Sequence, residues 1–227
     1  MVVASKRYRK GAERVDATKL YALKEAVGLL KTFPPAKFDE TVEVAIHLGI
    51  DPKKSDQLVR GAVSLPKGLG KSIRVVVFAE GARAEEAKAA GADHVGSEDL
   101  AKRINDGWTD FDVVIAAPDM MKHVGKLGKV LGPQGKMPSP KSGTVTAEVS
   151  QAVREFKAGK VEFRTDAGGS VHAPVGKRSF APEDLEANVG AFVDHVRHMR
   201  PASAKGIFIK KVVLSSTMSP GVPLDLR

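Results

Sequence analysis

Residues 41–48 read TVEVAIHL, a stretch in which apolar and polar side chains alternate. Its apolar members are Val42, Val44, Ile46 and Leu48. Because successive side chains of a strand point to opposite faces, these four would share one face and leave the other to Thr41, Glu43 and His47. The pattern predicts a half-buried strand whose polar face remains free for a partner.

The middle of the chain follows a different pattern. RVVVFA (74–79) and FDVVIA (111–116) are near-continuous apolar runs, and residues 84–90, 98–105 and 149–156 have helical spacing. Apolar strands that alternate with helices indicate a parallel sheet covered on both faces. The middle segment is therefore predicted to be a three-layer, Rossmann-like α/β domain.

Strand-like patterns return in the last third of the chain, around a helix predicted over 182–198. They are VEFR (161–164), SVHA (170–173) and IFIKKVVL (207–214). The two ends of the chain are thus α+β in style. We predict one discontinuous α+β domain, built from residues 1–67 and 160–227, with the α/β domain inserted at 68–159.

The first third adds two expectations. Residues 1–15 are basic and poorly patterned, which predicts an arm that becomes ordered on binding. Asp16 is predicted to cap a helix that ends before Pro34 and Pro35. The apolar stripe of that helix is Leu20, Leu23, Val27 and Leu30.

The composition restricts the class of protein. The chain has 227 residues and no Cys, which excludes disulfides, thiolate metal sites and a cysteine nucleophile. No apolar stretch approaches the roughly 18 residues of a membrane span. The basic N-terminus lacks the apolar core of a secretory signal. These features predict a soluble, cytoplasmic protein without a membrane partner.

The net charge of +9 points to a polyanionic partner. Residues 1–67 hold 13 basic and 8 acidic side chains, and residues 159–227 hold 10 and 7. Residues 68–158 hold 13 and 12, so the middle is almost neutral. A polyanion site is therefore expected in the ends of the chain.

No motif indicates catalysis. GLGKS (68–72) resembles the end of a phosphate-binding loop, but the pattern needs glycine where Leu65 stands, and this loop precedes its strand. No G-x-G-x-x-G follows the first apolar run of the middle segment. His195 and His198 lie three residues apart without other ligand candidates. We predict neither an enzyme nor a cofactor or metal site.

Polar segments of the ends suit the recognition of folded RNA. Aromatic residues make up 5% of the chain, which disfavours a stacking platform for single strands. Folded RNA is recognised through phosphates, 2′-hydroxyls and shape. Suitable groups occur in KFDET (37–41), FRTD (163–166), GGS (168–170) and SSTMS (215–219). In the middle domain, KVLGPQGKMP (129–138) is predicted to be a functional loop.

Two other classes remain open on these patterns alone. An α/β enzyme acting on a phosphorylated metabolite would account for the alternating middle domain, and its stabilisation by ATP or NAD would reveal it. A DNA-binding architectural protein would account for the charge. Competition between duplex DNA and structured RNA would separate that class from an RNA-binding protein.

Several longer stretches resemble the ribosomal protein L-one family, which belongs to the mobile stalk of the large ribosomal subunit. They are KFDETVEV (37–44), LGIDPKKSDQLVRGAVSLPKGLGK (48–71), LGPQGKMPSPKSGTV (131–145), GKVEFRTD (159–166), HAPVGK (172–177) and STM (216–218). Together they cover nearly the whole chain in order. The resemblance implies a two-domain protein with an inserted domain.

The resemblance also implies partners. The discontinuous domain is expected to bind ribosomal RNA of the stalk, and the protein to assist release of deacylated tRNA from the exit site. It is further expected to repress translation of its own messenger RNA, and to be monomeric when free. The residues implied to contact RNA are Lys37, Phe38, Thr41, Glu43, Arg164, Asp166, Gly169, His172, Ser216, Thr217, Met218 and Ser219.

One position departs from the family pattern. Where the family usually has Thr-Met-Gly, this chain has Thr217, Met218 and Ser219. If the glycine served a positive φ or a close approach of RNA, Ser219 would be locally strained. Gln134 and Lys136 also differ from the commonest residues of the loop in the middle domain.

Overall fold

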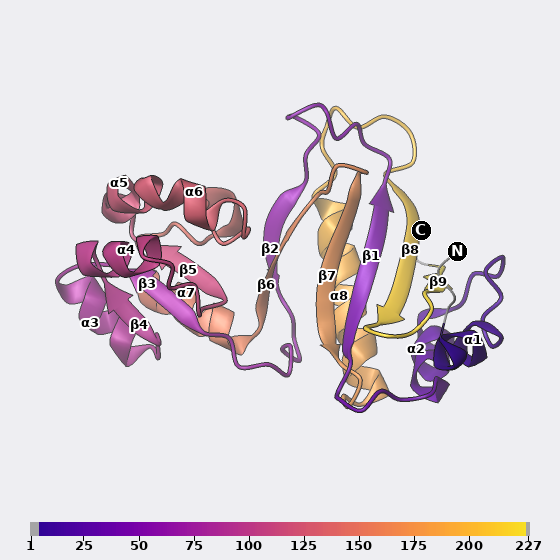
Figure 1. Ribbon diagram of the computed structural model, residues 1–227. Helices are drawn as coiled ribbons and strands as arrows, with labels where there is room; N and C mark the ends of the chain where they lie inside the picture. The colour runs from indigo at the N-terminus through magenta and orange to yellow at the C-terminus, as the bar shows by residue number, and fades with distance from the viewer. Residues whose placement is uncertain (1–4, 226–227) are drawn as a thin grey trace. The chain divides into compact units, whose positions relative to one another are not determined.

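The computed structural model describes residues 5–225, which form two compact units (Figure 1). The terminal unit comprises residues 5–70 and 161–225, and the inserted unit comprises residues 71–160. The terminal unit extends past residue 67 because the buried Asn188 holds this connector. Its Oδ1 accepts a hydrogen bond from the Lys67 amide (3.0 Å), and its Nδ2 donates to the Gly68 carbonyl (3.0 Å).

The terminal unit is organised around a four-stranded antiparallel sheet with the order β7-β1-β8-β9. Its strands are β1 (Thr41–Leu48), β7 (Ser170–Lys177), β8 (Ile209–Ser216) and β9 (Val222–Leu224). β1 confirms the predicted strand, with all four of its predicted apolar side chains buried. In the outer strands, Pro174 of β7 lies opposite Glu43, and Pro223 of β9 lies opposite Val213.

Three helices belong to the terminal unit: α1 (Lys6–Ala12), α2 (Leu23–Thr32) and α8 (Pro182–His198). α2 and α8 contact each other, and they pack against β8 and β7 respectively (Figure 1). The core between helices and sheet includes Leu30, Ile46, Val189, Phe192 and Leu214, all fully buried. α8 has the bounds and the first-turn proline predicted from the sequence.

The prediction of an unstructured N-terminal arm is wrong for residues 6–12, while residues 1–4 lie outside the described part of the chain. Helix α1 begins after Ser5, whose hydroxyl accepts a hydrogen bond from the Tyr8 amide (3.2 Å). Gly11 is buried so closely against Pro220 that a β-carbon on it would lie 3.1 Å from the proline ring. Tertiary contact therefore orders a segment whose own pattern is weak.

The predicted start of the next helix at Asp16 is also wrong. α2 begins seven residues later, after Ala22, and Asp16 instead accepts hydrogen bonds from the amide and hydroxyl of Thr18. The intervening backbone is used for pairing, because the Tyr21 amide donates to the Pro223 carbonyl (3.0 Å) and the Asp225 amide donates to the Tyr21 carbonyl (2.9 Å). The helix ends at Thr32, before the two prolines, as expected.

A separate two-stranded sheet pairs β2 (Arg60–Ser64) with β6 (Lys160–Arg164). No strand was predicted at β2 or at β9. β2 has five residues and includes Gly61, and β9 has three residues with Pro223 in the middle. Such short segments do not show a clear alternation.

The inserted unit contains a parallel sheet with the order β4-β3-β5, which confirms the predicted parallel pairing. Its strands are β3 (Val75–Phe78), β4 (His94–Gly96) and β5 (Val113–Ala116). Its longer helices are α3 (Ala82–Ala89), α4 (Glu98–Asn105) and α7 (Val149–Ala158). All four residues of β3 are buried, as expected of a strand covered on both sides.

A run of short helices in the inserted unit was not predicted. They are η1 (Pro118–Met120), α5 (Met121–Val124), η2 (Gly125–Leu127), α6 (Gly128–Leu131) and η3 (Pro140–Ser142). The predicted loop 129–138 is therefore wrong at its start, which belongs to α6. Its later part is anchored, because Lys136 Nζ donates to the Thr109 carbonyl (3.0 Å) and lies 4.8 Å from the centre of the Phe111 ring. Within residues 5–225, no helix has the length and apolar character needed to cross a bilayer.

Candidate nucleic-acid interface

One face of the four-stranded sheet is open, because α2 and α8 pack against the other. The side chains of β1 on this open face are Thr41, Glu43, Ala45 and His47, none of which is buried. Ala45 lies opposite His172 of β7 and Val213 of β8. The open sheet face is therefore a mostly polar strip, as the alternation in β1 predicted.

At one end of the open sheet face, three strand ends meet around Thr41. The Thr217 amide donates to the Thr41 carbonyl (3.0 Å), and the Thr217 Oγ1 accepts from the Thr41 amide (3.0 Å). Lys177 Nζ donates to the Thr41 hydroxyl (2.9 Å). We call Lys37, Phe38, Thr41, Lys177, Thr217 and Met218 the Thr217 cluster. The cluster brings together two sequence-predicted segments that are far apart in the chain.

Two large apolar side chains of the Thr217 cluster are exposed to solvent. Phe38 is 55% exposed and Met218 is 47% exposed. Both lie beside groups able to bind a polyanion, since Lys37 is also exposed and Thr217 carries a hydroxyl. Exposed apolar groups in a polar setting are typical of a contact surface.

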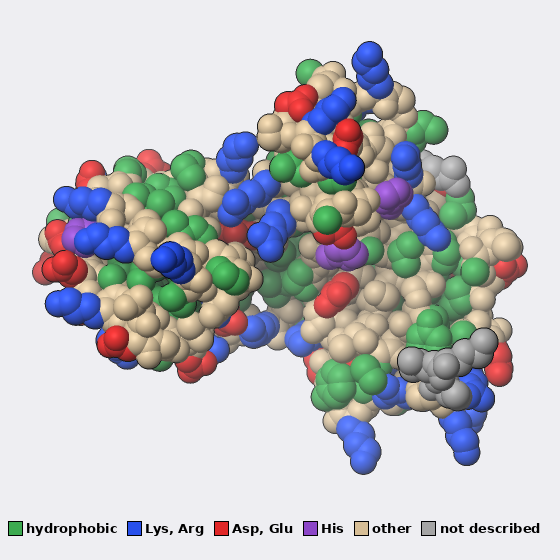
Figure 2. All heavy atoms as spheres, turned by 45° about the horizontal axis from the view of Figure 1, so that its top comes forward, with side chains coloured by type: hydrophobic (Ala, Val, Ile, Leu, Met, Phe, Trp, Pro, Cys, Tyr) green, Lys and Arg blue, Asp and Glu red, His purple; other side chains and the backbone are tan. Residues whose placement is uncertain are grey.

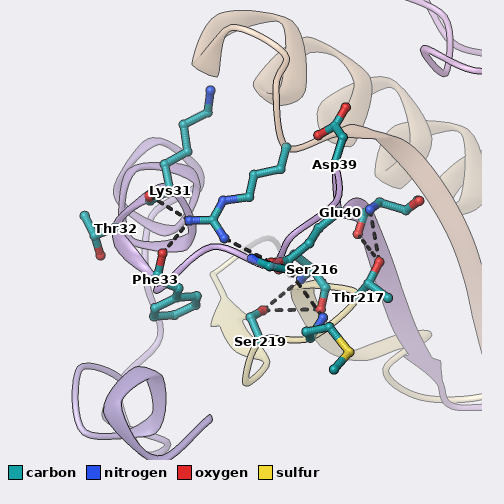
Figure 3. A network of polar contacts seen from close by, with 12 residues as sticks. Lys31, Thr32, Phe33, Asp39, Glu40, Ser216, Thr217 and Ser219 are labelled. Atoms are coloured by element: carbon teal, nitrogen blue, oxygen red, sulfur yellow. Dashed lines mark hydrogen bonds and ion pairs between the residues drawn. The ribbon is translucent and has the colours of Figure 1, made fainter. Parts of the chain in front are cut away.

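A buried carboxylate lies beneath the Thr217 cluster. Figure 3 shows Glu40 between the end of α2 at Phe33 and the turn that carries Ser216, Thr217 and Ser219. Glu40 is 1% exposed and pairs with the Arg178 guanidinium (Nη1–Oε1, 3.2 Å). Burial opposes its ionisation, but hydrogen bonds and the Arg178 charge outweigh burial and hold the pKa of Glu40 below its ordinary value.

The structure places Ser216 and Ser219 in supporting positions. Ser216 is 4% exposed, and its hydroxyl donates to Glu40 Oε2 (2.5 Å), so that hydroxyl is directed inward. The Ser219 Oγ accepts from the Ser216 amide (2.9 Å) and closes the turn around Thr217. Among residues 5–225, positive φ angles occur only at glycines, so Ser219 does not carry the strain considered for it.

A second group of predicted residues, which we call the Asp166 cluster, gathers where β6 turns into β7. It comprises Arg164, Asp166, Gly169 and His172. Asp166 Oδ1 accepts from the Ser170 (2.7 Å) and Gly168 (2.9 Å) amides, and Oδ2 lies 3.4 Å from His172 Nε2. The Ser170 amide is the main cause that lowers the pKa of Asp166, and it outweighs partial burial.

Gly169 has a structural reason to be glycine. Its φ is +78°, a conformation that L side chains rarely adopt, and its carbonyl accepts from the Leu48 amide (2.9 Å). This bond fixes the β6–β7 turn to the end of β1. Arg164, the last residue of β6, is exposed beside this turn.

The open sheet face connects the two clusters. Thr41 starts β1 at the Thr217 cluster, and His47, near the other end of β1, lies opposite Ser170 in the β6–β7 turn region. They are six residue steps apart along the strand, about 20 Å at 3.3–3.4 Å per residue. Glu43 and His172 lie between, so the predicted residues form one continuous strip.

Sequence reasoning missed Glu40, Lys177 and Arg178. Lys177 and Arg178 follow one another at the end of β7, and each reaches a residue near the start of β1. A hydrophobic pattern gives the face of a side chain but not the register of two strands 130 residues apart. In the sequence, the only indication of a role for Lys177 and Arg178 was that two cations stand together shortly after a predicted strand.

Basic side chains also gather beyond the strip. Figure 2 shows Lys and Arg side chains over the end of the terminal unit where, in Figure 1, the loops after β1 and before β8 lie. Exposed cations are Lys53, Lys54 and Lys205 in these loops, and Lys210 and Lys211 at the start of β8. They add long-range attraction for a polyanion to the local chemistry of the strip.

An exposed, polar and cationic sheet face defines the class of proteins that bind a large partner through a surface, in contrast to those that enclose a small molecule. Within residues 5–225 there is also no grouping of three His, Asp or Glu side chains able to hold a metal ion. The chain belongs to the ribosomal protein L1p/L10e family, whose model matches residues 30–220. This finding confirms the resemblance seen in the sequence.

Individual relatives match over nearly their whole length. The large ribosomal subunit protein uL1 of Fervidobacterium nodosum is 58% identical over 224 residues, covering 98% of this chain and 95% of the relative. The protein of the same name from Gemmatimonas aurantiaca is 56% identical over 225 residues, covering 99% and 98%. That from Kosmotoga olearia is 55% identical over 221 residues, covering 97% and 96%.

Proposed function

We propose that this protein is a structural component of the large ribosomal subunit and binds ribosomal RNA of the mobile stalk through the open sheet face of the terminal unit. The observation that carries the proposal is the continuous strip from the Thr217 cluster to the Asp166 cluster, backed by helices on its other side. The names of the relatives support a ribosomal, cytoplasmic location. They also support a structural role and not an enzymatic one.

Hydroxyl chemistry in the Thr217 cluster suits RNA. The Thr217 oxygen already accepts from the Thr41 amide at 3.0 Å, while its proton has only a long contact of 3.3 Å to the Thr41 carbonyl. The proton can therefore be donated to a ribose 2′-hydroxyl, a group that DNA lacks. Met218, the next residue, would shield this bond from water once RNA is bound, which raises the cost of leaving either partner unpaired, and Phe38 would pack against a ribose or base.

Charged residues divide the remaining work. Lys37, Lys177 and Arg164 would contact phosphates, which supplies affinity without sequence information. Glu43 and Asp166 face a polyanion, where a carboxylate is unfavourable unless it accepts a hydrogen bond from RNA or orients a cation. These acids would therefore favour an RNA whose hydroxyl and amino groups lie in the right places.

Replacing Thr217 with alanine should weaken binding of a stalk RNA fragment by about 1–3 kcal/mol, because the ribose 2′-hydroxyl covered in the complex loses its hydrogen bond. The slope of log affinity against log salt should change little, since no cation is removed. Titrations by fluorescence anisotropy at several KCl concentrations test this. Thr217→Ser, which keeps the hydroxyl, should retain most of the affinity, and a similar loss in both variants would contradict the assigned role.

Replacing Lys37 with alanine should instead reduce the magnitude of the salt slope by about one unit, because one phosphate contact is lost. The same titrations measure it. Lys88→Ala, an exposed lysine of α3 in the inserted unit, provides a control with the same change of charge. An equal slope change for Lys88→Ala would mean that overall charge, and not a local contact, governs the salt dependence.

The proposal extends to the other partners of the resemblance. The protein would assist release of deacylated tRNA from the exit site, and would repress its own synthesis by binding its messenger RNA on the same face. It would be monomeric when free. Competition for labelled stalk RNA tests the shared face: the messenger leader should displace it, whereas duplex DNA should not. Full affinity of the inserted unit alone for stalk RNA would refute the proposed interface.

A further inference from the structure

The two oxygens of the buried Glu40 serve two different segments of the terminal unit. Oε1 accepts a hydrogen bond from the Ala36 amide (2.9 Å), directly before Lys37 and Phe38. Oε2 accepts from the Ser216 hydroxyl (2.5 Å) and the Met218 amide (3.3 Å). One carboxylate therefore joins the two halves of the Thr217 cluster from below.

Arg178 fixes this carboxylate to the rest of the unit. Its side chain is 14% exposed, and its Nη1 donates to Glu40 Oε1 at 3.2 Å. Its Nη2 donates to the carbonyls of Lys31 (3.1 Å) and Phe33, at the end of α2. The Arg178 amide also donates to the Glu40 carbonyl (2.8 Å). The guanidinium thus satisfies helix-end carbonyls that would otherwise lack partners.

A buried ion pair is not needed for stability alone, because well-packed apolar residues of similar volume often stabilise a core as well or better. Here Glu40 accepts hydrogen bonds from the Ala36 and Met218 amides, so the pair adjoins the backbone that carries Phe38 and Met218, two of the large apolar side chains that stay exposed. Such side chains keep a fixed position at the surface only if their backbone is held. The bonds of Glu40 to the Ala36 and Met218 amides hold it on both sides.

We propose that Glu40 and Arg178 are positioning residues for RNA binding, which fix the Thr217 cluster in its binding geometry before RNA arrives. Neither is expected to touch RNA. A surface fixed in advance loses less conformational entropy on binding, so affinity rises without any added contact. This inference rests on the proposed function, since it concerns the same open sheet face.

The direct test is Glu40→Gln in the full chain, with affinity for the stalk RNA fragment measured at several salt concentrations. Glutamine keeps the size of the side chain and one acceptor oxygen, but its NH₂ group cannot accept, so either the hydrogen bonds of Ser216 and Met218 or that of Ala36 are lost. Affinity should fall about tenfold or more with an unchanged salt slope, while the circular dichroism spectrum stays that of the folded protein. Normal affinity would overturn the inference.

Asp39→Asn is the matched control, because it makes the same change of charge one residue away. Asp39 is exposed, and its carboxylate accepts hydrogen bonds from the amide (3.1 Å) and hydroxyl (2.8 Å) of Ser179. If only net charge mattered, both variants would bind the polyanion more tightly. We expect a loss for Glu40→Gln alone, and an equal loss for Asp39→Asn would overturn the assignment.

A double-mutant cycle separates positioning from general loss of structure. In a chain that already carries Thr217→Ala and Met218→Ala, the further change Glu40→Gln should cost clearly less affinity than in the unchanged chain, because two of the groups that Glu40 positions are gone. A loss as large as in the unchanged background would contradict the inference. If the unchanged chain does not bind stalk RNA, the proposed function itself fails. If the unchanged chain binds and Glu40→Gln binds equally well, the positioning role alone fails.

Arg178→Lys provides a second route if Glu40→Gln does not fold. Lysine keeps the charge beside Glu40 but cannot also reach both helix-end carbonyls, because it lacks the guanidinium fork. Affinity should again fall with an unchanged salt slope. Normal affinity in a folded Arg178→Lys variant would overturn its positioning role, because a single positive charge at this position would then suffice.

Discussion

Replacing Arg178 with alanine is expected to lower the free energy of unfolding of the terminal unit by about 3–5 kcal/mol, because Glu40 would remain buried without its counter-charge. Glu40 is almost completely buried, and among residues 5–225 Arg178 is the cation that forms an ion pair with it. The carbonyls of Lys31 and Phe33 would also lose their donor. Urea unfolding followed by circular dichroism measures the effect.

The pH dependence of this loss has a definite sign. The folded-state pKa of Glu40 is lowered, so its stabilising contribution is present above its ordinary pKa and disappears as the pH falls through the lowered value. The difference between the unchanged chain and Arg178→Ala should therefore shrink in acid. Arg164→Ala, an exposed arginine of the same unit, should cost less than about 0.5 kcal/mol. Equal costs at the two positions would mean that the buried pair has no special role.

Replacing Phe192 with alanine is expected to cost a similar amount, about 3–5 kcal/mol, for a different reason. Phe192 is fully buried on α8, and its ring meets that of Phe163 edge to face with centroids 5.3 Å apart. Alanine would leave a cavity between the helix and β6 that the surrounding core cannot fill completely. The measurement is again urea unfolding.

The Phe192 variant also separates stability from the binding surface. Phe192→Leu should recover most of the lost stability, because leucine refills much of the cavity. At low temperature, where Phe192→Ala remains folded, its affinity for stalk RNA should stay within about threefold of normal, since the cavity lies on the far side of the sheet from the open face. If Phe192→Ala lowered the free energy of unfolding by less than about 1 kcal/mol, the core would rearrange more freely than its packing indicates.

Much of the fold was predictable because each main element is buried on the same face, or on all faces, along its whole length, which leaves a regular pattern of apolar residues. β1 alternates because one face meets the core and the other stays in solvent, and β3 is a continuous apolar run because all of its residues are buried. α8 is long enough for its period and its proline at the start to be unambiguous. In each case the environment of the element is uniform along its length.

The elements that could not be predicted depend on contacts with distant parts of the chain. Helix α1 is held by the approach of Gly11 to Pro220, and the start of α2 is delayed because Tyr21 pairs with residues near the end of the chain. Neither contact leaves a periodic pattern. Local propensity therefore predicted an arm where residues 6–12 form a helix, and predicted a helix from Asp16 that in fact begins at Leu23.

The candidate site divides in the same way. Exposed residues such as Thr217 and Asp166 could be proposed from their chemistry and from family resemblance, because a binding residue must present its group to the partner. Glu40 and Arg178 present nothing to the outside. Their importance follows from a strand register and from burial, and both become visible only in three dimensions.

The two prolines in the outer strands bear on how the free protein avoids self-association. β7 and β9 form the margins of the four-stranded sheet, and a proline lacks the N–H that an added strand would need. Pro174 therefore interrupts the β7 margin as a template for edge-to-edge aggregation, while at the β9 margin Pro223 has no N–H and its carbonyl already accepts a hydrogen bond from the Tyr21 amide. The RNA-free protein can therefore expose an open polar sheet face without pairing its edge strands with those of another copy, which accords with the proposed monomer.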